Sequence, residues 1–346
     1  MTGAAGFAGG HLVEYLAAQQ AARLAARSFA HDGAPDRVTP DDAGRDETEA
    51  DEIVAWARSE PPTPLASLAR WERVDLLNRD RVRSAIAALR PTAVFHCAGI
   101  AHVAQSWTDT ATPLAGNVLA THHLLDAIRR SETPLGTSGQ PCRVLVTGSA
   151  TVYAPSDRPI PEDGAIAPGS PYALSKLAQE QLSLRALRED GIDVILARSF
   201  NHTGPRQVPA YAAPSFAQQV ARIERGECEA IIRVGNLDAR RDFTDVRDVV
   251  RAYAALMDAG VPGTIYNVAS GEGRSIRSVL DALVARANVR VRIELDERLL
   301  RPQDTPALVG DISRLTKATG WRREISFERI IDDLLAHWRG QASSAS

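Results

Sequence analysis

The sequence predicts an α/β fold with a doubly wound parallel sheet that carries helices on both faces. Short apolar runs alternate with helical patterns through about residue 200, and a glycine-rich turn opens the chain. The length of 346 residues suffices for one large or two modest domains. The composition is that of ordinary globular protein, with 44% hydrophobic residues and a mean hydropathy of −0.18.

The first predicted element is a glycine turn that opens a helix. The spacing of Gly3, Gly6 and Gly9 permits a tight turn, close approach of the backbone to a pyrophosphate, and close helix packing. Taken alone, this spacing fits plain turn chemistry equally well. A turn of this kind normally follows a strand, yet only Met1 and Thr2 precede it. We therefore expect that the first strand is missing from the recorded start, with Met1 standing where a strand-ending valine would be.

Four further runs predict buried strands, because they are short and rich in Val, Ile and Phe. These runs are residues 52–57, 92–97, 143–147 and 194–198. Residues 17–51 break the rhythm, because an Ala/Arg-rich piece passes into an acidic polar run without periodicity. We interpret this segment as a solvated insertion, with a regulatory lid as the alternative. Residues 340–346 are expected to form a frayed tail.

Charge and cysteine usage exclude several function classes. The net charge of −3 gives no general attraction to nucleic acid, and no segment is long and apolar enough to cross a membrane. Cys97, Cys142 and Cys228 have neither metal-ligand nor redox spacing. The sequence therefore predicts no metal site and no structural disulfide, and we expect a cytoplasmic protein.

The most informative pair is Tyr172 and Lys176. The chain has two lysines against 38 arginines, and one of the two lies four residues after a tyrosine, on the same face of a predicted helix. A nearby ammonium favours phenolate and lowers the pKa of the phenol, so that it can exchange a proton near neutral pH. The alternative is an exposed helical pair without a function.

Further motifs surround this pair. They are the glycine turn, Asp75-Leu76, residues 95–99 (Phe-His-Cys-Ala-Gly), Asn117, residues 149–153 (Ser-Ala-Thr-Val-Tyr) and residues 198–205 (Arg-Ser-Phe-Asn-His-Thr-Gly-Pro). Over essentially its whole length the chain resembles the extended short-chain dehydrogenase/reductase family. Residues 235–243, 266–271, 301–304, 310–311 and 320–321 are similar to the branch of GDP-mannose 4,6-dehydratases and GDP-4-keto-6-deoxy-D-mannose reductases. The resemblance implies a Rossmann-type dinucleotide-binding domain over residues 1–200. It also implies that residues 201–339 mainly form a smaller C-terminal α/β domain that binds the sugar nucleotide, with some chain returning to the first domain.

The resemblance assigns catalytic roles to Ser149, Tyr172 and Lys176. Tyr172 would donate the proton, Lys176 would lower its pKa and hold the nicotinamide ribose, and Ser149 would hydrogen-bond the substrate carbonyl. Thr151 stands where the dehydratases of the family carry a glutamate, and a threonine hydroxyl is a poor base for a carbon-bound proton. We therefore expect reduction of the C4 ketone of a GDP-4-keto-6-deoxy-hexose. GDP-mannose 4,6-dehydration, sugar-nucleotide C4 epimerisation and dinucleotide binding without turnover are the alternatives.

Arg58, which directly follows the predicted strand 52–57, is the residue on which the prediction of the cofactor rests. An NAD enzyme would place an acidic residue there, whereas a guanidinium suits a 2′-phosphate, so NADP(H) is favoured and NAD(H) is the alternative. The resemblance implies cofactor contacts from Gly3, Gly6, Phe7, Ala8, Arg58, Asp75, Leu76, Ala98, Gly99, Tyr172 and Lys176.

The substrate side is implied by the resemblance alone. Besides Ser149, contacts with a GDP-sugar are expected from Asn201, Asn236, Arg241, Arg301 and Asp304. The alternative for residues 240–242 is a surface ion network. Helices around residues 112–130 and 171–188 are expected to pair with their copies in a homodimer, as is usual for this fold.

Overall fold

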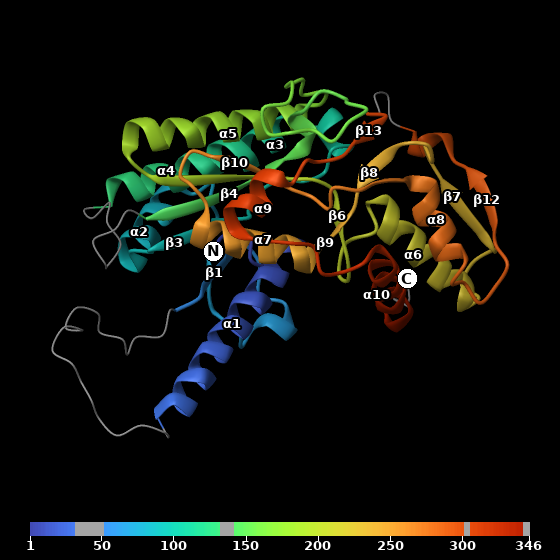
Figure 1. Ribbon diagram of the computed structural model, residues 1–346, viewed down its shortest axis with the longest axis horizontal. Helices are drawn as coiled ribbons and strands as arrows, with labels where there is room; N and C mark the ends of the chain where they lie inside the picture. Colours follow the sequence, from blue (N-terminus) through green and yellow to red (C-terminus); the bar gives the residue numbers. More distant parts are fainter. Residues whose placement is uncertain (32–51, 132–141, 301–304, 342–346) are drawn as a thin grey trace.

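The computed structural model describes residues 1–31, 52–131, 142–300 and 305–341 (Figure 1). Its centre is a parallel sheet in the order β2-β1, then Thr2, then β3-β4-β5-β10. The strands are β1 Val54–Ala57, β2 Arg70–Arg73, β3 Ala93–His96, β4 Arg143–Ser149, β5 Asp193–Ser199 and β10 Ile265–Val268. Each of the four predicted strands is present, with ends within two residues of the predicted ones.

The place between β1 and β3 is taken by the first two residues. The Thr2 amide donates to Phe95 O at 2.9 Å, and the Trp56 amide donates to Met1 O at 2.9 Å on the other side. Thr2 thus makes parallel bridges to both Trp56 and His96. No strand is assigned before the glycine turn among the described residues, so this single position joins the two parts of the sheet.

Helices cover both faces of the sheet. Helices α2 (Arg79–Leu89), α4 (Ala120–Arg130) and α5 (Pro171–Asp190) share one apolar core with Val144 and Val146. Helices α1 (Phe7–His31), α7 (Val246–Ala259) and α9 (Ser313–Thr319) share another with Leu145, the residue between them. Successive side chains of a strand point to opposite faces, so one continuous apolar run supplies both cores.

Helix α1 corrects one prediction. It continues to His31, so residues 17–31 are helical and the predicted insertion begins too early. Alanine and arginine are both good helix formers, which allows the helix to continue without an apolar stripe. Residues 18, 19 and 21–24 are exposed, as expected for a solvated segment. Residues 32–51 lie outside the described residues.

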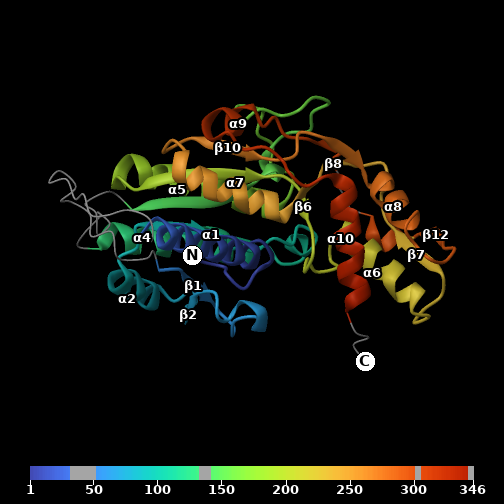
Figure 2. The ribbon, with the colours of Figure 1, turned by 60° about the horizontal axis from the view of Figure 1, so that its bottom comes forward.

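A third apolar core lies at the other end of the molecule. Figure 1 places α6 (Ala212–Glu224), α8 (Ile276–Val284) and α10 (Phe327–Gly340) there, with β7 (Ile231–Val234) and β12 (Arg292–Leu295). Figure 2 shows α10 running beside α6. The remaining short elements are α3 Ala111–Pro113, a π-helical segment Leu114–Leu119, β6 His202–Thr203, β8 Arg240–Asp242, β9 Thr244–Asp245, β11 Gly273–Ser275 and β13 Ala307–Leu308, with 3₁₀ turns at Thr63–Leu65, Gln105–Trp107, Ala150–Val152 and Glu297–Leu299.

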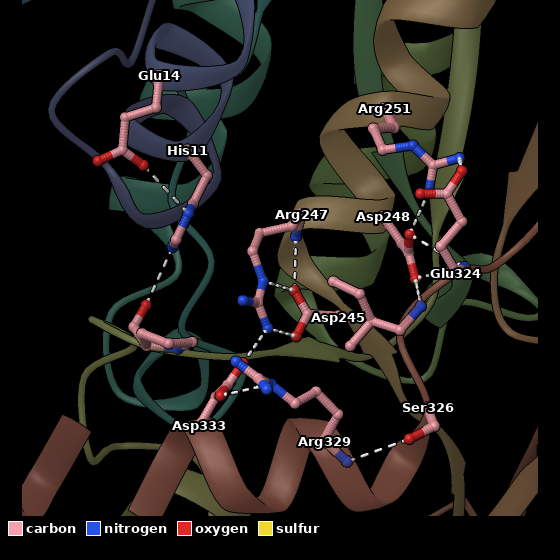
Figure 3. Close-up of polar contacts among 12 residues, drawn as sticks. His11, Glu14, Asp245, Arg247, Asp248, Arg251, Glu324, Ser326, Arg329 and Asp333 are labelled. Carbon is pink, nitrogen blue, oxygen red and sulfur yellow. Dashed lines mark hydrogen bonds and ion pairs between the residues drawn. The ribbon is translucent and has the colours of Figure 1, made fainter. Parts of the chain in front are cut away.

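Ion pairs attach the C-terminal segment to the start of α7 (Figure 3). The Arg247 guanidinium lies between Asp245, which it meets at 2.7 Å, and Asp333 of α10, which it meets at 2.6 Å. The buried Asp248 carboxylate accepts a hydrogen bond from the Ile325 amide, just before α10. Gly340 still belongs to α10, whereas residues 342–346 of the predicted tail lie outside the described residues. None of the described helices is long and apolar enough to span a membrane.

Candidate active site

The glycine turn lies against the loop that follows β3. Gly3 has a φ of 70°, and a Cβ there would lie 2.6 Å from the Ala98 amide nitrogen. A Cβ on Gly9 would lie 2.1 Å from Gly3 O, so a larger residue at either position would displace backbone. Gly6 precedes α1, whose first residues are Phe7 and Ala8. A backbone cradle at a helix N-terminus suits an anionic diphosphate.

The turn also meets the loop of residues 200–205. The Phe7 ring stacks on His202, with ring centroids 5.9 Å apart and planes 7° apart. The His11 Nε2 hydrogen donates to Pro205 O at 3.0 Å. Two predicted motifs that are almost 200 residues apart in sequence therefore lie side by side.

The ends of β1 and β2 carry the other predicted cofactor contacts. Arg58 follows β1 directly and is exposed. Asp75 follows β2 and is exposed, and its carboxylate accepts a hydrogen bond from the Leu77 amide. Leu76 is buried, and its carbonyl binds the His123 ring at 2.8 Å. Since the carboxyl ends of parallel strands meet at one edge, these residues lie on the side of the sheet that holds the turn.

Ser149 and Tyr172 meet where β4 ends and α5 begins. Ser149 is the last residue of β4, and its hydroxyl lies 2.9 Å from that of Thr151. Tyr172 is in the first turn of α5, behind Pro171 and the N-cap Ser170, which accepts from the Ala173 amide. Burial raises the pKa of Tyr172 to about 12, and hydrogen bonding to Ser149 acts in the opposite direction. The phenol is therefore protonated at neutral pH and can act as a proton donor.

Lys176 is buried one turn further along α5. Its ammonium donates to Thr147 O at 3.0 Å and to Gln179 Oε1 at 2.9 Å. Burial lowers the pKa of Lys176 to about 8. The predicted lowering of the Tyr172 pKa by Lys176 is wrong for this structure, because desolvation of the phenol dominates and the ammonium is directed to Thr147 and Gln179.

Two residues that were not predicted as site residues, Gln179 and Asn117, lie around Tyr172 and Lys176. Gln179 was not among the predicted site residues, although its spacing of three from Lys176 places it on the same helix face. Asn117, in the π-helical segment, binds both backbone groups of Ile100 and donates to Ser175 Oγ at 2.9 Å. π-Helical segments are frequent at functional sites. A side chain on Gly99 would collide with the Asn117 amide oxygen.

The predicted substrate residues that the structure describes differ in their exposure. Arg241 is buried and donates to Thr305 O at 2.6 Å. Asn201 and Asn236 are exposed, and the Asn236 side chain accepts from the Asp238 amide. The alternative of a surface ion network fails for Asp242, which is fully buried and accepts hydrogen bonds from the backbone and hydroxyl of Ser270. Arg301 and Asp304 lie outside the described residues.

A hydroxyl-rich site thus stands at the carboxyl edge of the sheet. It combines a buried proton donor, a neighbouring hydroxyl that can bind a carbonyl, and a buried cation. Among the residues that the structure describes, no group of three or more His, Cys, Asp or Glu side chains could hold a metal ion. The arrangement can donate a proton to an oxygen on which negative charge develops.

Comparison with known proteins places this chain among sugar-nucleotide enzymes. The family model described as GDP-mannose 4,6 dehydratase matches residues 1–334. A Pseudomonas aeruginosa protein named GDP-6-deoxy-D-mannose reductase is 36% identical over 282 residues, which cover 81% of this chain and 90% of that protein. An Arabidopsis thaliana protein named GDP-mannose 4,6 dehydratase 2 is 27% identical, over 77% of this chain and 70% of its own.

Solved structures share the fold over almost the full length. RMD from Pseudomonas aeruginosa, complexed with NADPH, has a TM-score of 0.75 and 32% identity, and covers 98% of this chain and 97% of its own. The UDP-glucose 4-epimerase of Thermus thermophilus, complexed with NAD, has a TM-score of 0.77 and 26% identity, and covers 99% and 98%. The α/β fold with a Rossmann-type parallel sheet is confirmed.

Proposed function

This chain belongs to the GDP-mannose 4,6-dehydratase family, within the extended short-chain dehydrogenase/reductase enzymes, and we propose that it is a reductase of that family. Its substrate is a GDP-4-keto-6-deoxy-hexose, whose C4 ketone it reduces to an alcohol. The observation that carries this proposal is the hydroxyl of Thr151 beside Ser149.

Position 151 separates reduction from dehydration by chemistry. A 4,6-dehydration must remove a proton from C5 and expel the C6 hydroxyl, which requires a carboxylate as base and acid. At position 151 a hydroxyl instead binds Ser149 at 2.9 Å. Two buried carboxylates that follow Thr151 in sequence already have partners. Glu180 pairs with Arg198 at 2.6 Å, and Glu162 accepts a hydrogen bond from the Asn267 amide. The higher identity to the relative named a reductase supports the same choice.

The roles of the chain's own residues follow from their positions. Tyr172, whose raised pKa keeps it protonated, donates its proton to the C4 oxygen, and the Ser149 hydroxyl hydrogen-bonds that oxygen as negative charge develops. Lys176 supplies a positive charge and a donor for a ribose hydroxyl. When bound, a dihydronicotinamide cofactor supplies the hydride for C4.

The residues at the carboxyl edge fit a nicotinamide dinucleotide. Gly3 and Gly9 leave room for a diphosphate beside the backbone, and the exposed Arg58 suits a 2′-phosphate. NADPH is therefore the proposed cofactor, in keeping with the NADPH complex of the Pseudomonas neighbour, and NADH is the alternative. On the substrate side, we assign contacts with the GDP-sugar to Asn201, Asn236, Arg241, Arg301 and Asp304.

Two parallel incubations test the proposal. The enzyme is given GDP-4-keto-6-deoxy-D-mannose with NADPH, and separately GDP-mannose with NADP⁺, while nicotinamide absorbance and product mass are followed. The proposal predicts equal amounts of NADPH consumed and of product that has gained two hydrogens. Loss of water from GDP-mannose without net cofactor change would identify a dehydratase, and tightly retained NAD with C4 inversion would identify an epimerase.

A Tyr172→Phe variant separates catalysis from mere dinucleotide binding. It is expected to bind NADPH but to lose roughly 100-fold or more of its turnover, because the proton donor is removed. Turnover equal to that of the wild type would place the proton donor elsewhere.

A further inference from the structure

A chain of buried hydrogen bonds leads from Lys176 into the sheet. The Lys176 ammonium donates to Gln179 Oε1 at 2.9 Å, and Gln179 Nε2 donates to Thr121 Oγ1 at 2.8 Å. The same oxygen lies 2.8 Å from His96 Nε2, and His96 Nδ1 lies 2.7 Å from Thr2 Oγ1. Each of these five side chains is at most 6% exposed, so water does not compete for their hydrogen bonds.

The direction of every bond in this chain can be assigned. The Thr121 hydroxyl donates its one proton to Asn117 O at 2.6 Å, because a carbonyl can only accept. Thr121 must therefore accept from both Gln179 and His96, which places the His96 proton on Nε2. His96 Nδ1 then accepts from the Thr2 hydroxyl, whose oxygen accepts from the Ala98 amide.

This assignment fixes the amide of Gln179. Its NH₂ group must face the Thr121 oxygen, so its carbonyl oxygen must face Lys176. Rotating the amide by half a turn would set two donors against each other at Lys176 and leave the Thr121 oxygen facing a carbonyl. The acceptor offered to the lysine is thus determined by residues of β3 and α4.

We propose that Gln179 is a positioning residue for Lys176, and that its amide, oriented by Thr121 and His96, holds the lysine as a charged ammonium at the site of reduction. The proposal rests on the function proposed above for that site. Thr147 O is the other acceptor and belongs to the backbone, so Gln179 is the partner that a substitution can remove. Two of the three ammonium hydrogens are used within the described chain, and the third can reach a ribose hydroxyl.

Among the residues that the structure describes, no carboxylate is paired with Lys176. His96 and Cys97, from the end of β3, both act on it; burial lowers the pKa of His96 to about 3 and raises that of Cys97 to about 12, so both are neutral near pH 7. Tyr172, from α5, is also protonated there. Glu180, the next residue after Gln179, pairs with Arg198. Neutral acceptors therefore hold the ammonium against the desolvation that lowers its pKa to about 8.

The two lysines of the chain make a direct test possible. The wild type, Gln179→Leu and Gln179→Glu are labelled with ¹³C at the lysine side chains and titrated by NMR. Lys317, exposed on α9, provides the internal reference, and a Lys317→Arg variant assigns the signals. Removing an acceptor of a charged donor should lower the pKa of Lys176 by about one pH unit in Gln179→Leu. The carboxylate of Gln179→Glu should raise it by at least as much.

Turnover provides the second readout. Because Lys176 must stay protonated, activity is lost as pH rises through its pKa. The pH at which activity is lost on the alkaline side, the alkaline limit, should move down in Gln179→Leu. It should move up in Gln179→Glu, in which the new side chain has the same size as that of glutamine. A matched change on α6, Gln219→Leu, should move neither the signal nor the limit.

The two proposals fail differently. A Lys176 titration that is unchanged in both Gln179 variants overturns the positioning role, whatever the activity. Absence of turnover of the keto sugar by the wild type, together with the expected pKa shifts, overturns the proposed reduction and leaves Gln179 as the partner of Lys176.

Discussion

At the scale of single residues, the hydroxyls of Ser149 and Thr151 are expected to contribute unequally to the rate of the proposed reduction. The Ser149 hydroxyl hydrogen-bonds that of Thr151, and it acts against the burial that raises the pKa of Tyr172. Ser149→Ala removes a donor to the developing oxyanion and is expected to lower kcat roughly 100- to 1000-fold. Thr151→Val removes only a partner of Ser149 and is expected to cost less than about tenfold. Steady-state kinetics with the keto sugar measure both; equal losses would mean that Thr151 itself touches the reacting atoms.

Arg58 decides the choice between the two nicotinamide cofactors. Arg58→Asp replaces a partner for a 2′-phosphate with a partner for ribose hydroxyls. The ratio of kcat/KM for NADPH to that for NADH should fall by roughly tenfold or more. Arg290→Asp serves as the control, because it makes the same charge reversal at an exposed residue shortly before β12. An unchanged ratio in Arg58→Asp would show that the 2′-phosphate is held elsewhere.

The sequence predicted the identity of the catalytic candidates better than their protonation. The spacing of Tyr172 and Lys176 was enough to place both on one helix face. The direction of the Tyr172 pKa depends on burial, which is set by packing from elsewhere in the chain. The role of Gln179 was hidden for a similar reason, because its partner Thr121 is 58 residues away in sequence.

At the scale of elements, the buried pair of Glu180 and Arg198 holds α5 against β5. The side chains are 2% and 4% exposed and meet at 2.6 Å. Arg198→Met leaves a buried carboxylate without its partner and should lower the free energy of unfolding by about 3–5 kcal/mol. The double variant with Glu180→Leu should lose clearly less than the sum of the two single losses, as measured by urea unfolding. Additive losses would contradict this coupling.

Helix α1 illustrates what local patterns omit. Its first two turns carry the apolar residues that pack on the sheet, such as Leu12 and Val13. Beyond them, the residues from 18 onward that the structure describes are mostly exposed, so no apolar periodicity marks the helix. The helix nevertheless continues to His31, because alanine and arginine have high helix propensity. This propensity was the signal from which the length of the helix could have been predicted.

At the scale of the whole molecule, we propose that α4 and α5 pair with their copies in a homodimer. Leu119, directly before α4, and Leu174, on α5, are exposed, and a groove of about 470 Å³ lies between the two helices. Leu174→Arg should convert a dimer of twice 37.3 kDa into a monomer, as measured by light scattering. Leu24→Arg, at a similarly exposed leucine of α1, is the control. A wild type of single-chain mass would contradict the dimer.

The overall topology was predictable where neighbouring strands are linked by local βα units. The positions of β1, β3, β4 and β5 followed from apolar runs. The pairing of β10 with β5 and the packing of α7 on the sheet involve chain that returns from beyond residue 240. Such long-range pairings are set by tertiary packing. The resemblance therefore implied that part of the chain beyond residue 200 returns to the first domain, but not which strand of the sheet it joins.

Reduction at C4 can be followed directly by the transfer of deuterium to GDP-4-keto-6-deoxy-D-mannose from NADPH that carries deuterium at both hydrogen positions of the nicotinamide C4. We expect one deuterium at C4 of the sugar, located by NMR, for each cofactor oxidised. The Tyr172→Phe variant should transfer it far more slowly. A product without deuterium at C4, or a wild-type enzyme that leaves the labelled cofactor unoxidised, would contradict the claim that this chain is a C4 ketone reductase.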